Sequence, residues 1–307
     1  MLRSFVSART LDHSLAMVVH VVFAAGILST AAPWSAVLPE GALLVPVEYR
    51  PFSSSKPEAA VDFASTAALR LLSEALNLSA SNTTYALASH SAGGAAVYQS
   101  LDFLALLTED PSRGFKEILG LAESCLPEPE VEELKGRLAK TTRPLLPVAV
   151  LSFEGSLMPC DVDGWAADWA LSTTPPKDEP WIQPALEDPG SQWTWFMARA
   201  CCRSLMERCA ADPPVHLRSI SQFFLLPAGP RFFYVAGAES KKRNDVVFPA
   251  LKKASAGSPG RLELKEIPHA GHNMHRDAPE AATRCQIRAF SCFVSGSQLQ
   301  LQADTDN

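Results

Sequence analysis

The sequence lacks a C-x-x-C pair, a glycine-rich phosphate loop and any run of more than three basic residues. Its seven cysteines are odd in number and irregularly spaced, which predicts free or buried thiols rather than a disulfide framework or a zinc site. The missing phosphate loop removes the usual nucleotide and dinucleotide signatures. A formal net charge of -6, without such a run, argues against a nucleic-acid partner.

The overall composition is ordinary for a globular protein, with 47% hydrophobic and 20% charged residues. A length of 307 residues fits one α/β domain with an insertion as well as it fits two domains. Composition therefore indicates a globular protein of one or two domains, and only local motifs carry information about its function.

The first 38 residues hold an ambiguous apolar segment. Residues 1–13 carry two arginines and no acid before Asp12, and residues 14–38 are largely apolar, as in a signal peptide, a membrane anchor or an organelle presequence. Gly26 and Pro33 interrupt the run, however, and a spanning helix needs roughly 20 apolar residues. We therefore expect a buried strand at 16–24, flexible tails at 1–15 and 296–307, and a cytoplasmic location. Organelle targeting, secretion and a membrane contact through this segment are the alternatives.

Apolar runs alternate with segments of helical periodicity along most of the chain. The expected strands are 21–26, 42–49, 84–88, 145–153, 231–236 and 262–267. The expected helices are 58–76, 95–107, 113–140 and 279–293. This alternation predicts an α/β fold with a doubly wound, mostly parallel sheet covered on both faces.

Residues 155–230 break the alternation. They contain five of the six tryptophans, and helical patterns occur at 192–209 and 217–226. We interpret 154–230 as a helical cap inserted into a core that is formed by 16–153 and 231–295.

One serine stands where an expected buried strand turns into a helix. In the segment Ser89-His90-Ser91-Ala92-Gly93-Gly94, small residues flank Ser91 at the spacing of a sharp strand-to-helix turn. Such a turn lifts the hydroxyl clear of the sheet and aims the next backbone N–H at the same point in space. A plain βα turn without catalytic function is the alternative interpretation of these residues.

Three histidines, His269, His272 and His275, follow the last expected strand. A loop at this place reaches the carboxyl edge of the sheet, where open α/β sheets bind their ligands. The cluster also suggests a metal, but Pro268 and Gly271 break helical geometry and no cysteine or carboxylate stands at ligand spacing. We therefore expect no metal.

These segments together make the chain resemble the α/β-hydrolase superfamily, in a form with a cap, over residues 21–293. The resemblance is carried by the turn around Ser91, by Gly271-His272 with Asp277-Ala278-Pro279-Glu280, and by Glu48-Tyr49-Arg50-Pro51 after the second strand. Little chain precedes residue 21, and the resemblance implies a sheet that is shortened on its N-terminal side, since that family has two further strands first.

The resemblance implies Ser91 as the nucleophile and His272 as the base, with the backbone N–H groups of Ala92 and Ile27 as oxyanion donors. Ala25 takes the place of the histidine in the family's His-Gly oxyanion loop, which removes a side chain but leaves the backbone donor.

The acid that would orient His272 has three candidates. The family's usual acid follows the strand 231–236, in a Gly-X-X-Asp pattern. When Gly237 is aligned with the glycine of that pattern, Ser240 takes the position of the acid and Glu239 stands one residue before it. The other position known in such folds follows the strand before the cap, which here ends at Glu154, with Asp161 further along. We favour Glu154 and keep Glu239 and Asp161 as alternatives.

A serine nucleophile implies acyl transfer, such as ester, thioester or amide hydrolysis, and needs no cofactor. Epoxide hydrolases and haloalkane dehalogenases of this fold have an aspartate nucleophile at the strand-to-helix turn, the position that Ser91 takes here. Ser91 therefore argues against both activities. We expect a serine hydrolase that cleaves a small ester-like molecule, whose apolar part meets the aromatic residues of the cap. The alternative is a catalytically silent α/β-hydrolase-fold protein that acts by binding.

Overall fold

The computed structural model describes residues 18–49 and 62–290, apart from residues 142, 143, 163, 189 and 228. The expectations for the tails, for a presequence, for Arg50 and Pro51, for Cys292 and for strands before residue 18 lie outside the described residues. Within those residues no helix is both long enough and apolar enough to cross a membrane.

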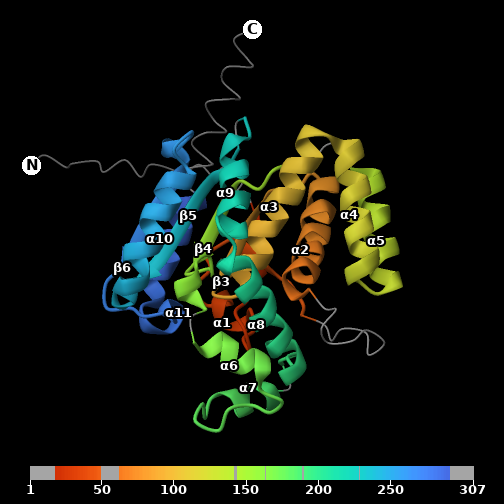
Figure 1. Ribbon diagram of the computed structural model, residues 1–307. Coiled ribbons are helices and arrows are strands. Elements are labelled where there is room, and N and C mark those ends of the chain that lie inside the picture. The colour runs from red at the N-terminus through yellow and green to blue at the C-terminus, as the bar shows by residue number, and fades with distance from the viewer. Residues whose placement is uncertain are drawn as a thin grey trace, which may run out of the picture.

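A parallel sheet forms the centre of the molecule (Figure 1). Its strands are β1 (Val19–Ala24), β2 (Ala42–Pro46), β3 (Tyr85–His90), β4 (Ala149–Phe153), β5 (Arg231–Gly237) and β6 (Leu262–Ile267). Their order across the sheet is β2-β1-β3-β4-β5-β6, and all neighbouring strands run parallel. Every residue of β3 and β4 is buried, which explains why their sequences are small or apolar except for Tyr85 and His90 of β3. The expected strands are thus confirmed, although β4 begins at Ala149 rather than at Leu145.

Helices cover the sheet on both faces, as the sequence predicts. Figure 1 shows α2 (Phe63–Ala80), α3 (Gly93–Glu109), α9 (Val215–Leu225) and α10 (Lys241–Ala254) along one face. Successive residues of a strand point to opposite faces. In β5 the ring of Phe232 meets Phe224 of α9, whereas Phe233 lines a hollow together with Ala281 and Cys285. The helical residues 279–290 therefore lie on the other face.

The polar stretch 113–140 forms two helices, not the single one that its periodicity indicates. They are α4 (Pro111–Cys125) and α5 (Glu128–Lys140). Leu126 between them is extended, with φ -101° and ψ 157°. The cause is Pro127, because steric contact with the proline ring disfavours helical conformation at the preceding residue.

The segment between β4 and β5 is mainly helical. It contains η2 (Pro159–Asp161), α6 (Trp165–Leu171), α7 (Ile182–Glu187) and α8 (Trp195–Ala210) before α9. In Figure 1, α6 and α7 lie below the sheet, whereas α9 runs beside α3 in the layer that covers it. The division into a core and a cap that spans 154–230 stays a prediction.

Loops at the carboxyl ends of the strands contain the residues singled out from the sequence. Gly26 follows β1, Ser91 follows β3, Glu154 follows β4 and His272 lies in the loop after β6. Short elements complete these loops and turns: α1 (Ala32–Ser35), η3 (Ala238–Ser240), η4 (Pro259–Arg261) and α11 (Met274–Asp277). Parallel strands bring their carboxyl ends to one edge, so the topology gathers residues that are up to 246 positions apart, from Gly26 to His272.

Candidate active site

Ser91 occupies a strained turn between β3 and α3. Its φ of 53° lies in the left-handed region, which a residue with a side chain enters at a cost of about 1 kcal/mol or more. Backbone hydrogen bonds hold the turn: Ser91 N–H donates to the Phe153 carbonyl at 3.1 Å, and Ser156 N–H donates to the Ser91 carbonyl at 3.0 Å. The predicted sharp strand-to-helix turn is therefore present, and it is tied to the end of β4.

The two glycines after Ala92 are required by close backbone contacts. A Cβ on Gly93 would lie 2.1 Å from the Ala24 carbonyl oxygen, and a Cβ on Gly94 would lie 2.6 Å from the Cα of Gly155. Both distances are far inside van der Waals contact. The small residues allow α3 to begin directly against β1 and against the end of β4.

The loop after β1 passes directly beside Ser91. A Cβ on Gly26 would lie 3.1 Å from the Ser91 Cβ, so the chain is closely packed there. Ile27, the next residue, lines a cavity that Ser91 also lines. Two aromatic side chains hold this loop from either side. The Tyr49 hydroxyl donates to the Ala25 carbonyl at 2.8 Å, and the Trp193 indole N–H donates to the Ser29 carbonyl at 2.9 Å.

Ala92 is the N-cap residue of α3 and lines the same cavity. The first N–H groups of a helix have no partner within the helix, and the helix dipole favours negative charge at this end. The position is therefore electrostatically suited to an anion beside Ser91.

His272 and Glu154 form a hydrogen-bonded pair. The imidazole Nδ1 lies 2.8 Å from Glu154 Oε2, and its side chain is 45% exposed whereas that of Glu154 is 1% exposed. A carboxylate can only accept, so Nδ1 carries the proton and Nε2 presents its lone pair. This tautomer is the one that a general base requires.

Glu154 is held in place by several groups. It has a φ of 47°, and its Oε1 accepts from the Gly237 N–H at 2.7 Å. Burial raises the pKa of Glu154, but the hydrogen bond to His272, the Arg243 and His272 charges and the Gly237 N–H outweigh burial and lower that pKa to about 2. Glu154 is therefore a carboxylate across the physiological pH range.

The other two acid candidates have different surroundings. Asp161 Oδ2 accepts from the Leu157 and Met158 N–H groups at 2.6 and 2.9 Å. Glu239 is exposed, and its Oε2 would lie 3.5 Å from a Cβ added to Gly271. Since the Nδ1 hydrogen of His272 is directed at Glu154, the structure brings Glu154, rather than Asp161 or Glu239, into contact with the imidazole.

His90 connects the strand of Ser91 to the loop of His272. Its Nε2–H donates to the His272 carbonyl at 2.9 Å, and the centroids of the two rings are 4.7 Å apart. Burial is the largest of the causes that lower the pKa of His90 well below its ordinary value, so the imidazole is neutral. On its other side it packs on Trp34, which also contacts His275.

The histidines after β6 face different groups. His272 meets Glu154, His275 is buried against Trp34, and His269 is exposed. Within the described ranges of the chain, no group of three or more histidine, cysteine, aspartate or glutamate side chains is arranged to hold a metal ion.

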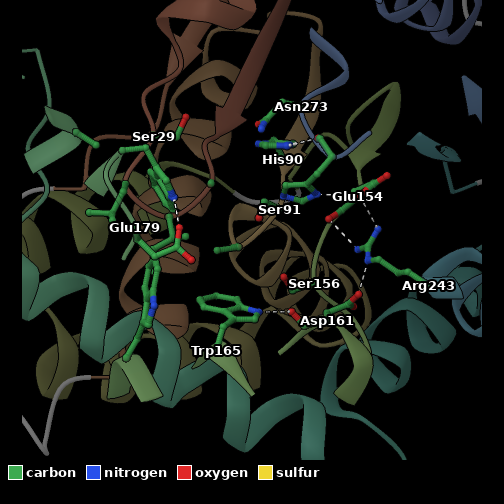
Figure 2. A pocket seen from close by; sticks show the side chains of 18 of the residues that line it. Ser29, His90, Ser91, Glu154, Ser156, Asp161, Trp165, Glu179, Arg243 and Asn273 are labelled. Carbon is green, nitrogen blue, oxygen red and sulfur yellow. Dashed lines mark hydrogen bonds and ion pairs between the residues drawn. The ribbon is translucent and has the colours of Figure 1, made fainter. Parts of the chain in front are cut away.

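A cavity of about 660 Å³ opens above Ser91 (Figure 2). Ser91, Glu154 and His272 lie at its base, with Ala92 and Ile27 beside them. Trp165, Trp169 and Trp181 contribute aromatic surface from the segment between β4 and β5, and Figure 2 shows Trp165 across the cavity from His90. Glu179 and Arg276 are charged residues of the lining.

Sequence reasoning did not identify three supporting residues. His90 belongs to the Ser91 motif, but no pattern indicated its bond to the His272 loop. Trp193 was recognised only as one of several tryptophans in the insertion. Arg243, which contacts both Glu154 and Asp161, stands in an ordinary helical segment and has no local signal.

Comparisons with known proteins give structural similarity only. No family model matches the chain, and no curated protein matches its sequence. The structure is similar to a haloalkane dehalogenase loop variant from Bradyrhizobium elkanii, with a TM-score of 0.52, 12% identity, and coverage of 93% of this chain and 93% of that chain.

Further similar structures are esterase B from Lactobacillus rhamnosis and MenH from S. aureus. The esterase has a TM-score of 0.48 at 14% identity, covering 96% of this chain and 81% of that chain. MenH has a TM-score of 0.47 at 12% identity, covering 93% of this chain and 96% of that chain.

Similarity at 12% identity concerns the architecture and leaves the reaction to be argued from the site. The architecture has a parallel sheet with helices on both faces, a serine on the turn after β3, and a histidine after the last described strand. The chain has the α/β-hydrolase fold.

Proposed function

We propose that this protein is a serine hydrolase that cleaves ester-like acyl bonds. Ser91 is the nucleophile, His272 the general base and Glu154 the acid that orients His272. The backbone N–H groups of Ala92 and Ile27 stabilise the oxyanion.

One observation carries this proposal. A serine in a strained left-handed turn shares its cavity with a histidine, and that histidine donates its Nδ1 hydrogen to a buried carboxylate. A plain βα turn needs neither the left-handed serine nor the oriented imidazole. Buried carboxylates and strained residues are costly, and they persist where a function requires them.

The first half of the reaction acylates the serine. As Ser91 Oγ attacks the carbonyl carbon, its proton moves to Nε2 of His272, and the carbonyl electrons move onto the oxygen. Glu154 stabilises the imidazolium through Nδ1–H. Each N–H donor to the oxyanion contributes about 3 kcal/mol to the barrier reduction. When the tetrahedral intermediate collapses, the imidazolium gives its proton to the leaving alkoxide, and an acyl ester of Ser91 remains.

The second half regenerates the enzyme with water. His272 takes a proton from water as the oxygen attacks the acyl carbonyl, and the same donors stabilise the second oxyanion. Collapse releases the carboxylic acid and returns the proton to Ser91 Oγ. The cycle needs no cofactor, because every proton passes through the His272 imidazole.

The cavity favours substrates with an apolar or aromatic group. Its volume of about 660 Å³ exceeds what an acetyl ester occupies, and three tryptophans supply aromatic surface. The indole N–H groups of Trp165 and Trp181 are bonded to the Asp161 carbonyl and to Glu179. The rings, rather than these donors, are therefore left to meet the substrate.

Labelling with a fluorophosphonate tests the nucleophile. We expect folded wild-type protein to be labelled and the adduct to map to Ser91 by peptide mass spectrometry. Ser91→Ala and heat-denatured protein should not be labelled, whereas Ser221→Ala, which removes a hydroxyl from α9 outside the cavity, should be labelled normally. Folded wild-type protein that resists labelling would support a silent binding protein and overturn the proposal.

Turnover of acetyl, octanoyl and phenylacetyl esters of the same phenol tests the substrate class. We expect kcat/KM to rise from the acetyl ester to the two larger esters, and Ser91→Ala to abolish turnover of all three. A preference for the acetyl ester would refute the proposed apolar specificity while leaving the hydrolase proposal intact.

A further inference from the structure

Arg243, in the first turn of α10, makes an unusual set of contacts at the base of the cavity. Its Nη2 donates to the Glu154 and Gly155 carbonyls at 2.8 and 2.9 Å, and its Nη1 lies 3.2 Å from Glu154 Oε2. Its Nε donates to Asp161 Oδ1. The side chain is 14% exposed, so these contacts form away from bulk solvent.

Asp161 extends this arrangement into the start of the inserted segment. Its side chain is 2% exposed, and one carboxylate oxygen accepts from the Leu157 and Met158 N–H groups while the other meets Arg243. One guanidinium therefore connects the side chain of Glu154, the backbone beside it and the segment that follows. A planar group with several fixed donors can do this, whereas a single ammonium cannot.

We propose that Arg243 is a positioning residue of the active site, which fixes Glu154 against His272 and, with Asp161, holds the chain that leads from β4 into the insertion. This inference rests on the proposed function, since it assigns Arg243 to the support of the residue that orients the base.

The charges around Arg243 indicate what its removal would do. Glu154 at the end of β4 and Asp161 in η2 face it with negative charge, and His272 lies behind Glu154. Tyr98 of α3, Tyr234 of β5 and Cys209 of α8 also interact with it electrostatically.

The side chains of Tyr98, Tyr234 and Cys209 stay neutral near pH 7, because burial raises their pKa values. Without the guanidinium, two buried carboxylates would face each other and His272 with no cation between them. Protonated His272 would then be stabilised and would lose its proton only at higher pH.

The pH dependence of kcat/KM for an aryl ester tests this inference. In Arg243→Met we expect the acid limb of the profile to move upward by about two pH units, as a unit charge about 6 Å away, reached through the 3.2 Å Arg243–Glu154 and 2.8 Å Glu154–His272 contacts, implies at an effective dielectric constant of about 20. We also expect at least a tenfold loss of kcat at the plateau, because Glu154 is no longer fixed.

Two variants separate positioning from folding. Arg208→Met breaks another partly buried ion pair, between Arg208, whose side chain is 15% exposed, and Asp62. This variant should leave the acid limb in place. Arg243→Lys retains the charge but cannot form all the bonds, so its acid limb should stay near that of the wild type while kcat falls. If Arg243→Met does not fold, the lysine variant alone decides, because wild-type kcat in that variant would overturn the inference.

A second readout does not depend on turnover. The midpoint of the His272 imidazole titration, followed by proton NMR and assigned through His272→Ala, should move upward in Arg243→Met and not in Arg208→Met. An unchanged midpoint and an unchanged acid limb in folded Arg243→Met would overturn the inference. If wild-type protein neither turns over esters nor reacts with fluorophosphonate, the proposed function fails instead, and the NMR titration still reports on the arrangement.

Discussion

Replacing Glu154 by glutamine removes one negative charge but keeps the size of the side chain. In the wild-type protein Oε2 accepts the Nδ1 hydrogen of His272, and Oε1 accepts the Gly237 N–H. A glutamine can keep only one acceptor oxygen. If its amide NH₂ faces His272, it donates to Nδ1 and forces the proton onto Nε2, which can then no longer accept the proton of Ser91.

The kinetic effect follows from that loss of the active tautomer and of the charge that stabilises the imidazolium. The corresponding change in a serine-protease triad lowers kcat by about 10⁴-fold. Because Arg243 already offsets part of the Glu154 charge here, we expect a decrease of about 10³- to 10⁴-fold for Glu154→Gln. The remaining turnover would come from the oxyanion donors and from substrate binding.

Glu154→Gln should also change how the free energy of unfolding depends on pH, in a direction set by the pKa of Glu154. The folded protein lowers the pKa of Glu154 from its ordinary value of 4.5 to about 2, so the stabilisation is fully present above pH 4.5 and is lost as the pH falls through this range towards 2. It amounts to about 3 kcal/mol at neutral pH. The difference in unfolding free energy between wild type and Glu154→Gln should therefore shrink on acidification.

The assay compares kcat/KM for an aryl ester at pH 8, and urea unfolding at pH 7 and pH 3, in three proteins. Glu239→Gln serves as the matched control, because Glu239 is exposed and the substitution is chemically the same. We expect near wild-type turnover in that control. A Glu154→Gln enzyme within tenfold of the wild type, or a larger loss in Glu239→Gln, would refute the assignment of Glu154 as the acid.

Two further predictions concern the cavity wall and the stability of the fold. Trp165→Ala should raise KM for a phenylacetyl ester by about tenfold and change KM for an acetyl ester little, because the indole contributes wall surface that only the larger group reaches. Equal effects on both esters in a steady-state comparison would contradict this view of the wall. Arg261→Ala should lower the unfolding free energy in urea by about 2 to 3 kcal/mol without changing kcat, since Arg261 donates to the Phe223, Phe224 and Leu226 carbonyls at the end of α9. A stability loss below about 0.5 kcal/mol would show that these bonds are replaced by water.

The architecture was predictable because its signals are local. Buried parallel strands are continuous apolar runs, so β3 and β4 could be located to within a few residues. One error arose where a single residue changes the backbone. Pro127 divides the stretch 113–140 into two helices, although the apolar spacing on either side is helical.

The turn of the candidate site was predictable, because its motif requires particular residues at short spacing. Ser91 was located because a sharp turn needs small neighbours, and the structure shows the contacts that exclude a Cβ at Gly93. Its proposed partners are distant in sequence, and only the fold shows which acid candidate contacts His272. Glu154 and Glu239 both stand just beyond the carboxyl end of a strand, so sequence position favoured Glu154 but left Glu239 open as an alternative.

Glu154 connects the proposed chemistry to the segment between β4 and β5. It follows β4 directly, and within seven residues the chain reaches Asp161, which shares Arg243 with it. A displacement of η2 would therefore act on Glu154 through one side chain. An acid in the loop after β5, where Glu239 stands, would not have this connection. The geometry thus couples the beginning of the insertion to the orientation of His272, so substitutions in 157–161 should alter kcat as well as KM.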